Sequence, residues 1–196
     1  MTNLYLARHG ETDWNKFDRK IGNVDIKLNE MGIQQALNLA EKLKSIDIDK
    51  IYSSPLSRAL QTAKIIKNIH PKSPEITMLE ALKEISLGIL QGKTTKEIEK
   101  FLPGFDVMND QHRKMLNIEP IKKSVKEWKN LLPFFINRSK DKILMISHKR
   151  KIMVILLAMG LTLSDLDQFS FKTGTIIKAE VIISANHPQI EYLEEV

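Results

Sequence analysis

The order of apolar and polar positions predicts short strands that alternate with helices. Residues 3–7 form an apolar run that ends at a charged cluster, which is typical of a buried strand. In residues 30–45 the apolar positions recur at helical spacing, so we predict a helix that packs on a sheet, with Asn29 as its cap. The positions expected to face inward are Ile33, Ala36, Leu37, Ala40 and Leu43.

The next elements repeat this alternation. Residues 50–53 are predicted to be a second strand, which Pro55 ends, and residues 57–68 follow as a second helix. Residues 75–79 form a weaker third strand. The second helix is expected to turn Ala59, Leu60, Ala63 and Ile66 inward.

The stretch between residues 94 and 138 differs in character from its surroundings. It contains Pro103-Gly104, several polar residues and two or three helical patterns, so we expect a helical insertion over about residues 95–140. One of its helices has a clear apolar side, and Pro133 is expected to kink or interrupt that helix. The apolar side consists of Trp128, Leu131, Leu132 and Phe135.

The C-terminal part returns to strands. Residues 142–147 are predicted to be a buried strand, followed by a helix over about residues 149–160. Residues 175–183 are rich in β-branched side chains, residues 184–188 are turn-like, and residues 189–193 are predicted to be a final strand. We expect the last two strands to form an antiparallel hairpin.

Strands that alternate with helices indicate an α/β fold in three layers, with a mainly parallel sheet flanked by helices. The chain shows no internal repeat, linker or low-complexity tract. We therefore predict a single domain over residues 1–196, with the helical insertion and the C-terminal hairpin as additions.

Composition narrows the classes of protein further. Of the 196 residues, 42% are hydrophobic and 28% are charged, which fits a folded chain with an ordinary core. The absence of cysteine excludes a disulfide framework, a thiolate nucleophile and a cysteine zinc site. The apolar run over residues 152–163 is shorter than the roughly 20 residues of a membrane span, and the first residues lack the layout of a signal peptide. We expect a cytoplasmic protein without a membrane partner.

The formal net charge of +6 is compatible with an anionic partner. The lysines are scattered over predicted helix faces, and no basic stretch is interleaved with aromatic residues. We therefore expect a small anionic substrate and no nucleic acid. The sequence leaves open whether the protein forms a homo-oligomer.

Polar residues follow the predicted strands where these strands end. Residues 8–12 (RHGET) follow the first strand, residues 53–58 (SSPLSR) the second and Glu84 the third, while the fourth ends at Ser147-His148. In parallel sheets, ligands bind beyond the carboxyl ends of the strands. Two arginines, two histidines and one glutamate are thus expected to converge at one edge of the sheet.

These residue types suit the transfer of a phosphoryl group. A neutral imidazole attacks phosphorus and forms a covalent intermediate. Two guanidinium groups match the phosphoryl oxygens with forked donors, and a second imidazole adds a donor as charge develops. A carboxylic acid protonates the leaving oxygen and then, as the carboxylate, activates water. Gly10 is expected to permit close backbone approach beside the nucleophile.

Four ordered motifs carry a family resemblance. They are residues 8–12 with Asn15, residues 53–63 (SSPLSRALQTA), the set Leu82, Glu84, Gly88 and Gly92, and Ser147-His148. Together they resemble the histidine phosphatase superfamily, in the branch that contains cofactor-dependent phosphoglycerate mutases and related phosphatases.

The resemblance implies a role for each matched residue. His9 would carry the phosphoryl group, Glu84 would donate and accept the proton, and the phosphate pocket would consist of Arg8, Arg58 and His148. It further implies that no metal or cofactor is needed, and the acidic residues show no metal-ligand spacing. The residues expected to bind substrate are Asn15, Arg19, Gly22 and Lys149.

Two departures from the family pattern bear on the substrate. Ile21 stands where many relatives have glutamine, which removes an amide from the predicted substrate loop. Lys149-Arg150-Lys151 stands where many relatives have two glycines, and three cations in the first turn oppose the helix dipole. A bound polyanion, nearby carboxylates or water would offset that repulsion, and a solvated helix start is the alternative to substrate binding.

Three functions are compatible with these motifs and departures. A phosphomonoester phosphatase fits best, because Glu84 continues as Ile85-Ser86-Leu87-Gly88 without the Asn-Glu-Arg-like continuation and paired tyrosines of the mutases. A phosphoglycerate mutase is the first alternative, and a phosphate-binding scaffold with weak catalysis is the second. The remaining histidines, which are expected at the surface, are His70, His112 and His187.

Overall fold

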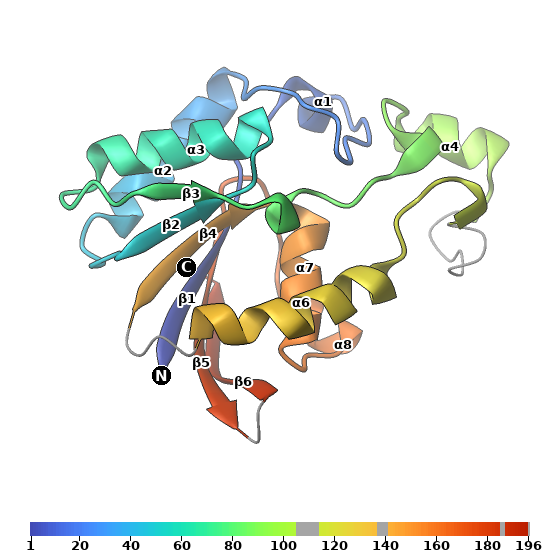
Figure 1. The fold of residues 1–196 in the computed structure, drawn as a ribbon. Coiled ribbons are helices and arrows are strands. Elements are labelled where there is room, and N and C mark those ends of the chain that lie inside the picture. The colour runs from blue at the N-terminus through green and yellow to red at the C-terminus, as the bar shows by residue number, and fades with distance from the viewer. Residues whose placement is uncertain (105–113, 137–140, 185–186, 196) are drawn as a thin grey trace.

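Strands β1 and β4 are apolar on both faces, which places them in the middle of a sheet. In the computed structural model, described for residues 1–104, 114–136, 141–184 and 187–195, the sheet has six strands in the order β3-β2-β4-β1-β5-β6 (Figure 1). The pairs β3-β2, β2-β4 and β4-β1 are parallel, whereas β1-β5 and β5-β6 are antiparallel. The strands are β1 (Thr2–Arg8), β2 (Lys50–Ser53), β3 (Ile76–Met78), β4 (Lys142–Ser147), β5 (Ile176–Ser184) and β6 (His187–Glu195).

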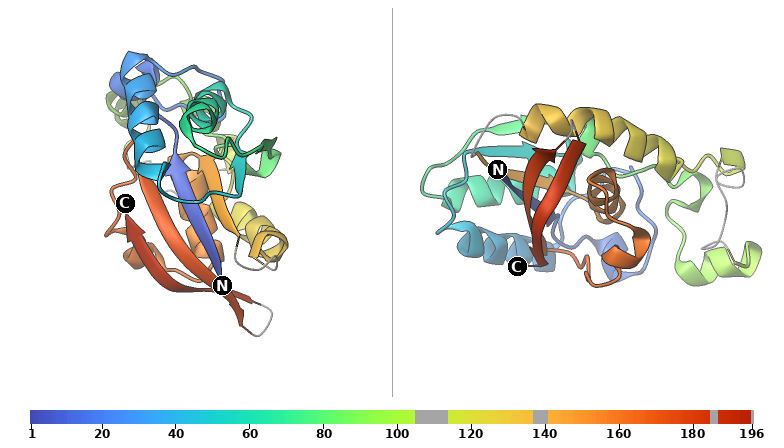
Figure 2. Two further views of the ribbon diagram at one scale, coloured as in Figure 1. Left: turned by 90° about the vertical axis from the view of Figure 1, so that its left-hand side faces the viewer. Right: turned by 90° about the horizontal axis from the view of Figure 1, so that it is seen from below.

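Helices cover both faces of this sheet (Figure 2). On one face, α2 (Glu30–Leu43) and α3 (Ser57–Ile69) pack on alternate residues of β1 and β4, such as Tyr5 and Leu144. On the other face, α6 (Ile121–Ile136) and α7 (Lys149–Ala158) pack on the intervening residues. The predicted three-layer α/β fold and its C-terminal antiparallel hairpin are confirmed. The short elements are α1 (Asp13–Lys16), η1 (Glu80–Leu82), η2 (Gly88–Leu90), α4 (Thr95–Phe101) and α8 (Leu163–Leu166).

The predicted inward stripe of α2 is wrong at its start. Ile33, a predicted inward position, is 45% exposed. Leu39, which the predicted stripe does not include, is buried instead. The buried side of the helix begins at Gly32, so Ile33 lies about 100° further round the helix axis and faces solvent. Asn29 caps the helix as predicted, because its side chain accepts a hydrogen bond from the Gly32 N–H.

Within the predicted insertion, α4 lies beyond the N-terminal end of α6, away from the sheet (Figure 1), whereas α6 packs against α7. The expected interruption at Pro133 is wrong, since α6 continues to Ile136. Pro133 falls in the last turn, where one carbonyl loses its partner, and burial of Trp128, Leu132 and Ile136 holds that turn on the core.

The surface prediction for His70 is also wrong. Its ring is buried, with Nε2 2.8 Å from the Ile46 carbonyl oxygen, and Nδ1 accepts a hydrogen bond from the Lys72 N–H at 3.2 Å. Both nitrogens thus fasten the end of α3 to the neighbouring loop. His112 and the side chain of His187 lie outside the described residues.

In the described part of the chain, every helix is too short or too polar to cross a bilayer.

The start of α2 positions the loop that carries the first motif. Gly10 and Gly32 face one another so closely that a β-carbon on Gly32 would overlap the Glu11 carbonyl oxygen. The Asn29 N–H donates to that oxygen at 3.0 Å, and the Glu11 N–H donates to Oε1 of Gln35 at 2.8 Å. Gly10 therefore permits a close approach between two backbone segments, and the segment that approaches it is the start of α2 at Gly32.

Replacing Gly32 by alanine is expected to destabilise the fold. Alanine gains up to about 1 kcal/mol of helix propensity over glycine, but overpacking against backbone costs about 1–3 kcal/mol or more. We expect a net loss of about 1–2 kcal/mol in the free energy of unfolding, measured by denaturant titration. Gln34→Ala, at an exposed position of the same helix, is the control and should unfold like the wild type. A Gly32→Ala protein more stable than the wild type would contradict the close contact.

Candidate active site

His9 follows directly after β1 and is almost fully buried, at 2% exposure. Its backbone N–H donates to the Ser147 carbonyl oxygen at 3.1 Å, which ties it to the end of β4. Its Nδ1 lies 2.6 Å from the Gly10 carbonyl oxygen. Because a carbonyl oxygen only accepts, Nδ1 carries the proton and Nε2 carries the lone pair.

Arg58 lies between the two predicted histidines, in the first turn of α3. Its Nε donates to Nε2 of His9 at 3.2 Å and to Nδ1 of His148 at 3.2 Å. Its two terminal nitrogens donate to the carbonyl oxygens of Val24 at 2.7 Å and Gly22 at 2.8 Å. Burial lowers the pKa of Arg58 to about 10, so it is still a cation at neutral pH.

His148 is buried at the end of β4, with its ring centroid 5.0 Å from that of His9. Arg58 donates to its Nδ1, so the proton of the neutral ring lies on Nε2. Nε2 is 2.9 Å from Oγ of Ser54, a residue that the second motif contains. Ser54 therefore accepts the His148 N–H and sets which nitrogen faces Arg58.

Both histidines are neutral at physiological pH. Burial holds the pKa of His9 well below its usual value of 6.5, and the Arg58 and Arg8 charges lower it further. Burial likewise lowers the pKa of His148, and the charge of Arg58 lowers it further. A neutral imidazole, which keeps a lone pair on one ring nitrogen, is the form that attacks an electrophile.

Arg8, the last residue of β1, is anchored at one nitrogen. Its Nη1 donates to the Phe171 carbonyl oxygen at 2.6 Å, whereas the buried Nε has no hydrogen-bond partner among the described residues. Burial lowers the pKa of Arg8, and the Glu84 carboxylate opposes that shift. A buried N–H of a cation that has no hydrogen-bond acceptor costs folding free energy. An anionic oxygen bound at that position would accept from this N–H and remove the cost.

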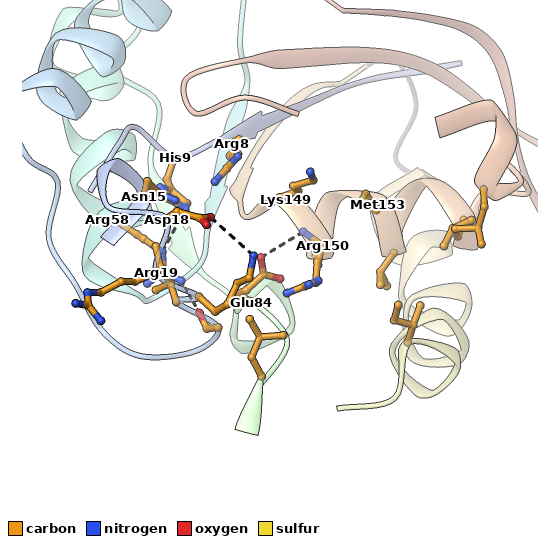
Figure 3. Close-up of a pocket in the computed structure, with 18 residues that line it drawn as sticks. Arg8, His9, Asn15, Asp18, Arg19, Arg58, Glu84, Lys149, Arg150 and Met153 are labelled. Atoms are coloured by element: carbon orange, nitrogen blue, oxygen red, sulfur yellow. Dashed lines mark hydrogen bonds and ion pairs between the residues drawn. The ribbon is translucent and has the colours of Figure 1, made fainter. Parts of the chain in front are cut away.

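Glu84 reaches the same place from the loop after η1. Its Oε1 accepts from the Ile85 N–H at 3.0 Å, and its Oε2 accepts from the Arg150 N–H at 3.2 Å. The second bond caps the N-terminus of α7 with a carboxylate, as Figure 3 shows. A negative charge there offsets the repulsion between the helix dipole and the cations of the first turn.

The basic run 149–151 divides between two environments. Lys149 lines the cavity described below, and burial together with the charges of Arg8 and Arg150 lowers its pKa. Lys151 is 5% exposed, and its Nζ lies 3.1 Å from Oγ of Ser124 and 4.0 Å from Oε1 of Glu119. The interpretation of the basic run as a solvated helix start is therefore wrong for Lys151. The nearby Glu119 carboxylate explains how this lysine is buried.

The motifs enclose a cavity of about 480 Å³. Eight of the nine predicted residues line it, and the ninth, His148, accepts a hydrogen bond from Arg58, which does line it. Distant segments thus meet as the sequence predicts. The eight residues are Arg8, His9, Asn15, Arg19, Gly22, Arg58, Glu84 and Lys149.

Arg19 and Gly22 line the cavity but are engaged with protein. Nη1 of Arg19 donates to the Gly92 carbonyl oxygen at 2.7 Å and lies 3.8 Å from a Glu97 oxygen. Gly22 has a positive φ of 57°, which glycine adopts readily, and its carbonyl oxygen accepts from Arg58. In the described state these two residues shape the loop around the guanidinium of Arg58.

Asn15 and Ile21 complete that loop. Oδ1 of Asn15 accepts from the Thr12 backbone N–H at 3.1 Å, which closes a capping box at the start of α1. Ile21 is buried and also lines the cavity, so the position of the missing amide presents an apolar surface. Contact of Asn15 with substrate stays a prediction.

The sequence reasoning missed one wall of the cavity. This wall comes from α6, α7 and α8 and is apolar. Met153 and Leu157 follow Lys149 at intervals of four residues, so a helical projection would have placed them on the same face. The wall consists of Ile121, Met153, Val154, Leu157 and Leu163.

The described residues contain no group of three or more His, Cys, Asp or Glu side chains that could hold a metal ion.

A histidine lone pair, two arginines and a carboxylate thus lie together at the carboxyl ends of the parallel strands of an α/β protein. The chain belongs to the histidine phosphatase superfamily (branch 1), whose profile matches residues 4–195.

Two curated relatives come from Arabidopsis thaliana. "Phosphoglycerate mutase-like protein 4" is 43% identical over 102 residues, covering 51% of this chain and 44% of the relative. "Metal-independent phosphoserine phosphatase" is 39% identical over 116 residues, covering 56% and 48%. The chain spans about half the length of the curated relatives it matches.

Solved structures match over the whole chain. Phosphoserine phosphatase from Entamoeba histolytica, in complex with 3-phosphoglyceric acid, has a TM-score of 0.76 and 30% identity, covering 100% of this chain and 98% of that one. A mycobacterial glucosyl-3-phosphoglycerate phosphatase has a TM-score of 0.83 at 20% identity, covering 98% and 97%, which shows the shared fold alone.

The two buried histidines predict loss of stability in mild acid. Folding lowers both pKa values, so below about 6.5 the unfolded chain binds protons that the folded chain does not. The free energy of unfolding should fall as pH drops from 6.5 to 5, by up to ~1.4 kcal/mol per pH unit for each histidine. Denaturant titrations at several pH values measure this slope.

Single variants identify the groups responsible. His9→Gln and His148→Gln should each flatten the slope relative to the wild type. A slope that neither variant changes would mean that other groups cause the acid lability.

Proposed function

We propose that the chain is a phosphomonoester phosphatase that works through a phosphohistidine on His9 and needs no metal. The observation that carries the proposal is the state of His9, whose lone pair at Nε2 faces Arg58 while Nδ1–H donates to Gly10. The family membership and the phosphatase relatives support the same chemistry.

In the first step Nε2 of His9 attacks phosphorus, and the bond from phosphorus to the ester oxygen breaks. The positive charge that forms on the imidazole is stabilised through Nδ1–H by the Gly10 carbonyl oxygen. Arg58 exchanges its bond to His9 for the phosphoryl oxygens, and Nε of Arg8 gains the acceptor that the described protein does not supply.

Glu84 handles the proton in both steps. As the carboxylic acid it protonates the departing ester oxygen, and as the carboxylate it takes a proton from the water that attacks phosphohistidine. The bond from phosphorus to Nε2 then breaks, which returns inorganic phosphate and the lone pair of His9. The bonds from Ile85 and Arg150 hold the carboxylate beside the cavity throughout.

His148 is proposed to stabilise the phosphoryl group as a cation. A bound dianion favours the protonated form of a neighbouring imidazole, so phosphate is expected to raise the pKa of His148. Nδ1–H then donates to a phosphoryl oxygen while Nε2–H donates to Ser54. Ser54 is in this way a positioning residue that acts through His148.

The phosphatase activity is tested with a panel of phosphomonoesters in chelator, by measuring released phosphate. The wild type should turn over and His9→Ala should lose at least about 1,000-fold in kcat, because no other nucleophile lies at that point. His70→Asn replaces a buried histidine outside the cavity and is the control, with activity expected at wild-type level.

Three outcomes would contradict the phosphatase proposal. They are phosphate binding without turnover, full activity of His9→Ala, and isomerisation of 3-phosphoglycerate without phosphate release, which would identify a mutase.

Ser54→Ala tests the positioning role. Loss of the hydrogen bond to His148 should lower kcat about tenfold, which corresponds to roughly 1.4 kcal/mol. Without that acceptor the protonated ring is less favoured, so the alkaline limb of the kcat profile should move to lower pH. Ser54→Thr should restore the profile, and Ser53→Ala, which removes the adjacent buried hydroxyl, should leave it unchanged. A drop in kcat without any shift of the pH profile would refute the role.

A further inference from the structure

The cavity is polar at one end and apolar at the other. At the His9 end the guanidinium groups of Arg8 and Arg58 face the carboxylate of Glu84. Figure 3 shows Met153 further along α7, beyond Lys149 and Arg150. The apolar end consists of Ile121, Met153, Val154, Leu157 and Leu163.

This apolar end does not stop at the edge of the cavity. A second hollow of about 640 Å³ continues between α6, α7 and α8 and shares Ile121, Leu157 and Leu163 with the first. Three lysines of α6 also line this second hollow, namely Lys122, Lys126 and Lys129. We call the continuous surface the apolar groove, and it consists of Ile121, Val125, Leu157, Leu161 and Leu163.

The groove presents apolar surface to solvent in the described structure. Leu163 is 64% exposed, and the side chains of Val125, Leu157 and Leu161 are partly exposed. Exposed apolar surface that is contiguous with a ligand site is typical of a binding groove.

The position of Glu84 decides which part of a substrate meets the groove. Glu84 is bound to the first turn of α7 through the Arg150 N–H. Because Glu84 protonates the ester oxygen in the proposed reaction, the leaving group starts at that turn. From there, Lys149, Met153 and Leu157 lie one turn apart on one face of α7, over about 12 Å. The leaving group therefore runs along α7 toward the groove.

We propose that the preferred substrate is a phosphomonoester of a hydrophobic alcohol, whose apolar chain lies in the apolar groove while its phosphoryl group faces His9. The proposal rests on the phosphatase function. It assigns specificity to Leu157 and Leu163, whose side chains belong to both hollows. The cations Lys149 and Arg150 stand between the two ends, and a preference for polyanionic substrates is the opposing outcome of the test.

The test is a series of primary alkyl phosphates with ethyl, butyl, hexyl and octyl chains, kept at concentrations where they do not aggregate. The basicity of the leaving oxygen is nearly constant in this series, so changes in kcat/KM report binding of the chain. Each buried methylene should raise kcat/KM about two- to fourfold, which gives at least about 50-fold from ethyl to octyl. An oligoethylene glycol phosphate of octyl length is the polar match and should not share the gain.

Variants locate the effect. Leu157→Asn with Leu163→Ser should lower the ratio of kcat/KM for octyl over ethyl phosphate about tenfold. Phe134→Ser removes an exposed aromatic side chain of α6 outside the groove and should keep the wild-type ratio.

The outcomes separate the two proposals. Equal kcat/KM across the series, equal use of the polar match, or a higher value for 3-phosphoglycerate than for octyl phosphate would overturn the hydrophobic substrate while leaving the phosphatase intact. No turnover of any phosphomonoester by wild type would overturn the phosphatase itself.

Discussion

The guanidinium of Arg58 holds two imidazoles that no strand or helix alone would bring together. One N–H is shared between His9 and His148, and the remaining nitrogens are bound to carbonyl oxygens of the loop at Gly22 and Val24. The arrangement keeps a cation buried between two neutral rings, which is tolerable because each ring supplies a lone pair. It also fixes the tautomer of each ring, and hence which nitrogen of His9 carries the lone pair.

Electrostatics couples this centre to the helices around it. Six cationic residues line the cavity against two carboxylates, so the site has a large excess of positive charge. Burial lowers the pKa of Arg8, Arg58 and Lys149, and neighbouring cations lower the pKa of Arg58 and Lys149 further. Such a centre favours a dianion, since the incoming charge relieves the repulsion. The Glu84 carboxylate accepts from the Arg150 N–H at the start of α7, and in the proposed reaction the same carboxyl group would also serve the reacting oxygen.

The cavity also joins elements with different tasks. The phosphoryl end is formed by loops that follow strands, where the backbone is held by the sheet and by the contact between Gly10 and Gly32. The apolar end is formed by the faces of α6 and α7 with the start of α8. In the proposed reaction, the chemistry and the choice of leaving group would thus be carried by separate segments, and substitutions in one need not disturb the other.

The sequence by itself determined the α/β class, because strands and helices differ in the period of their apolar positions. It also predicted which residues gather around His9, since the motifs follow strands whose ends must meet. It missed contacts that depend on the rotation of a helix or the packing of distant segments. These are the exposed Ile33, the buried His70, the pairing of Lys151 with Glu119 and the apolar wall at Leu157. Local pattern specifies each element, but only tertiary packing decides which side chains from different elements share a cavity.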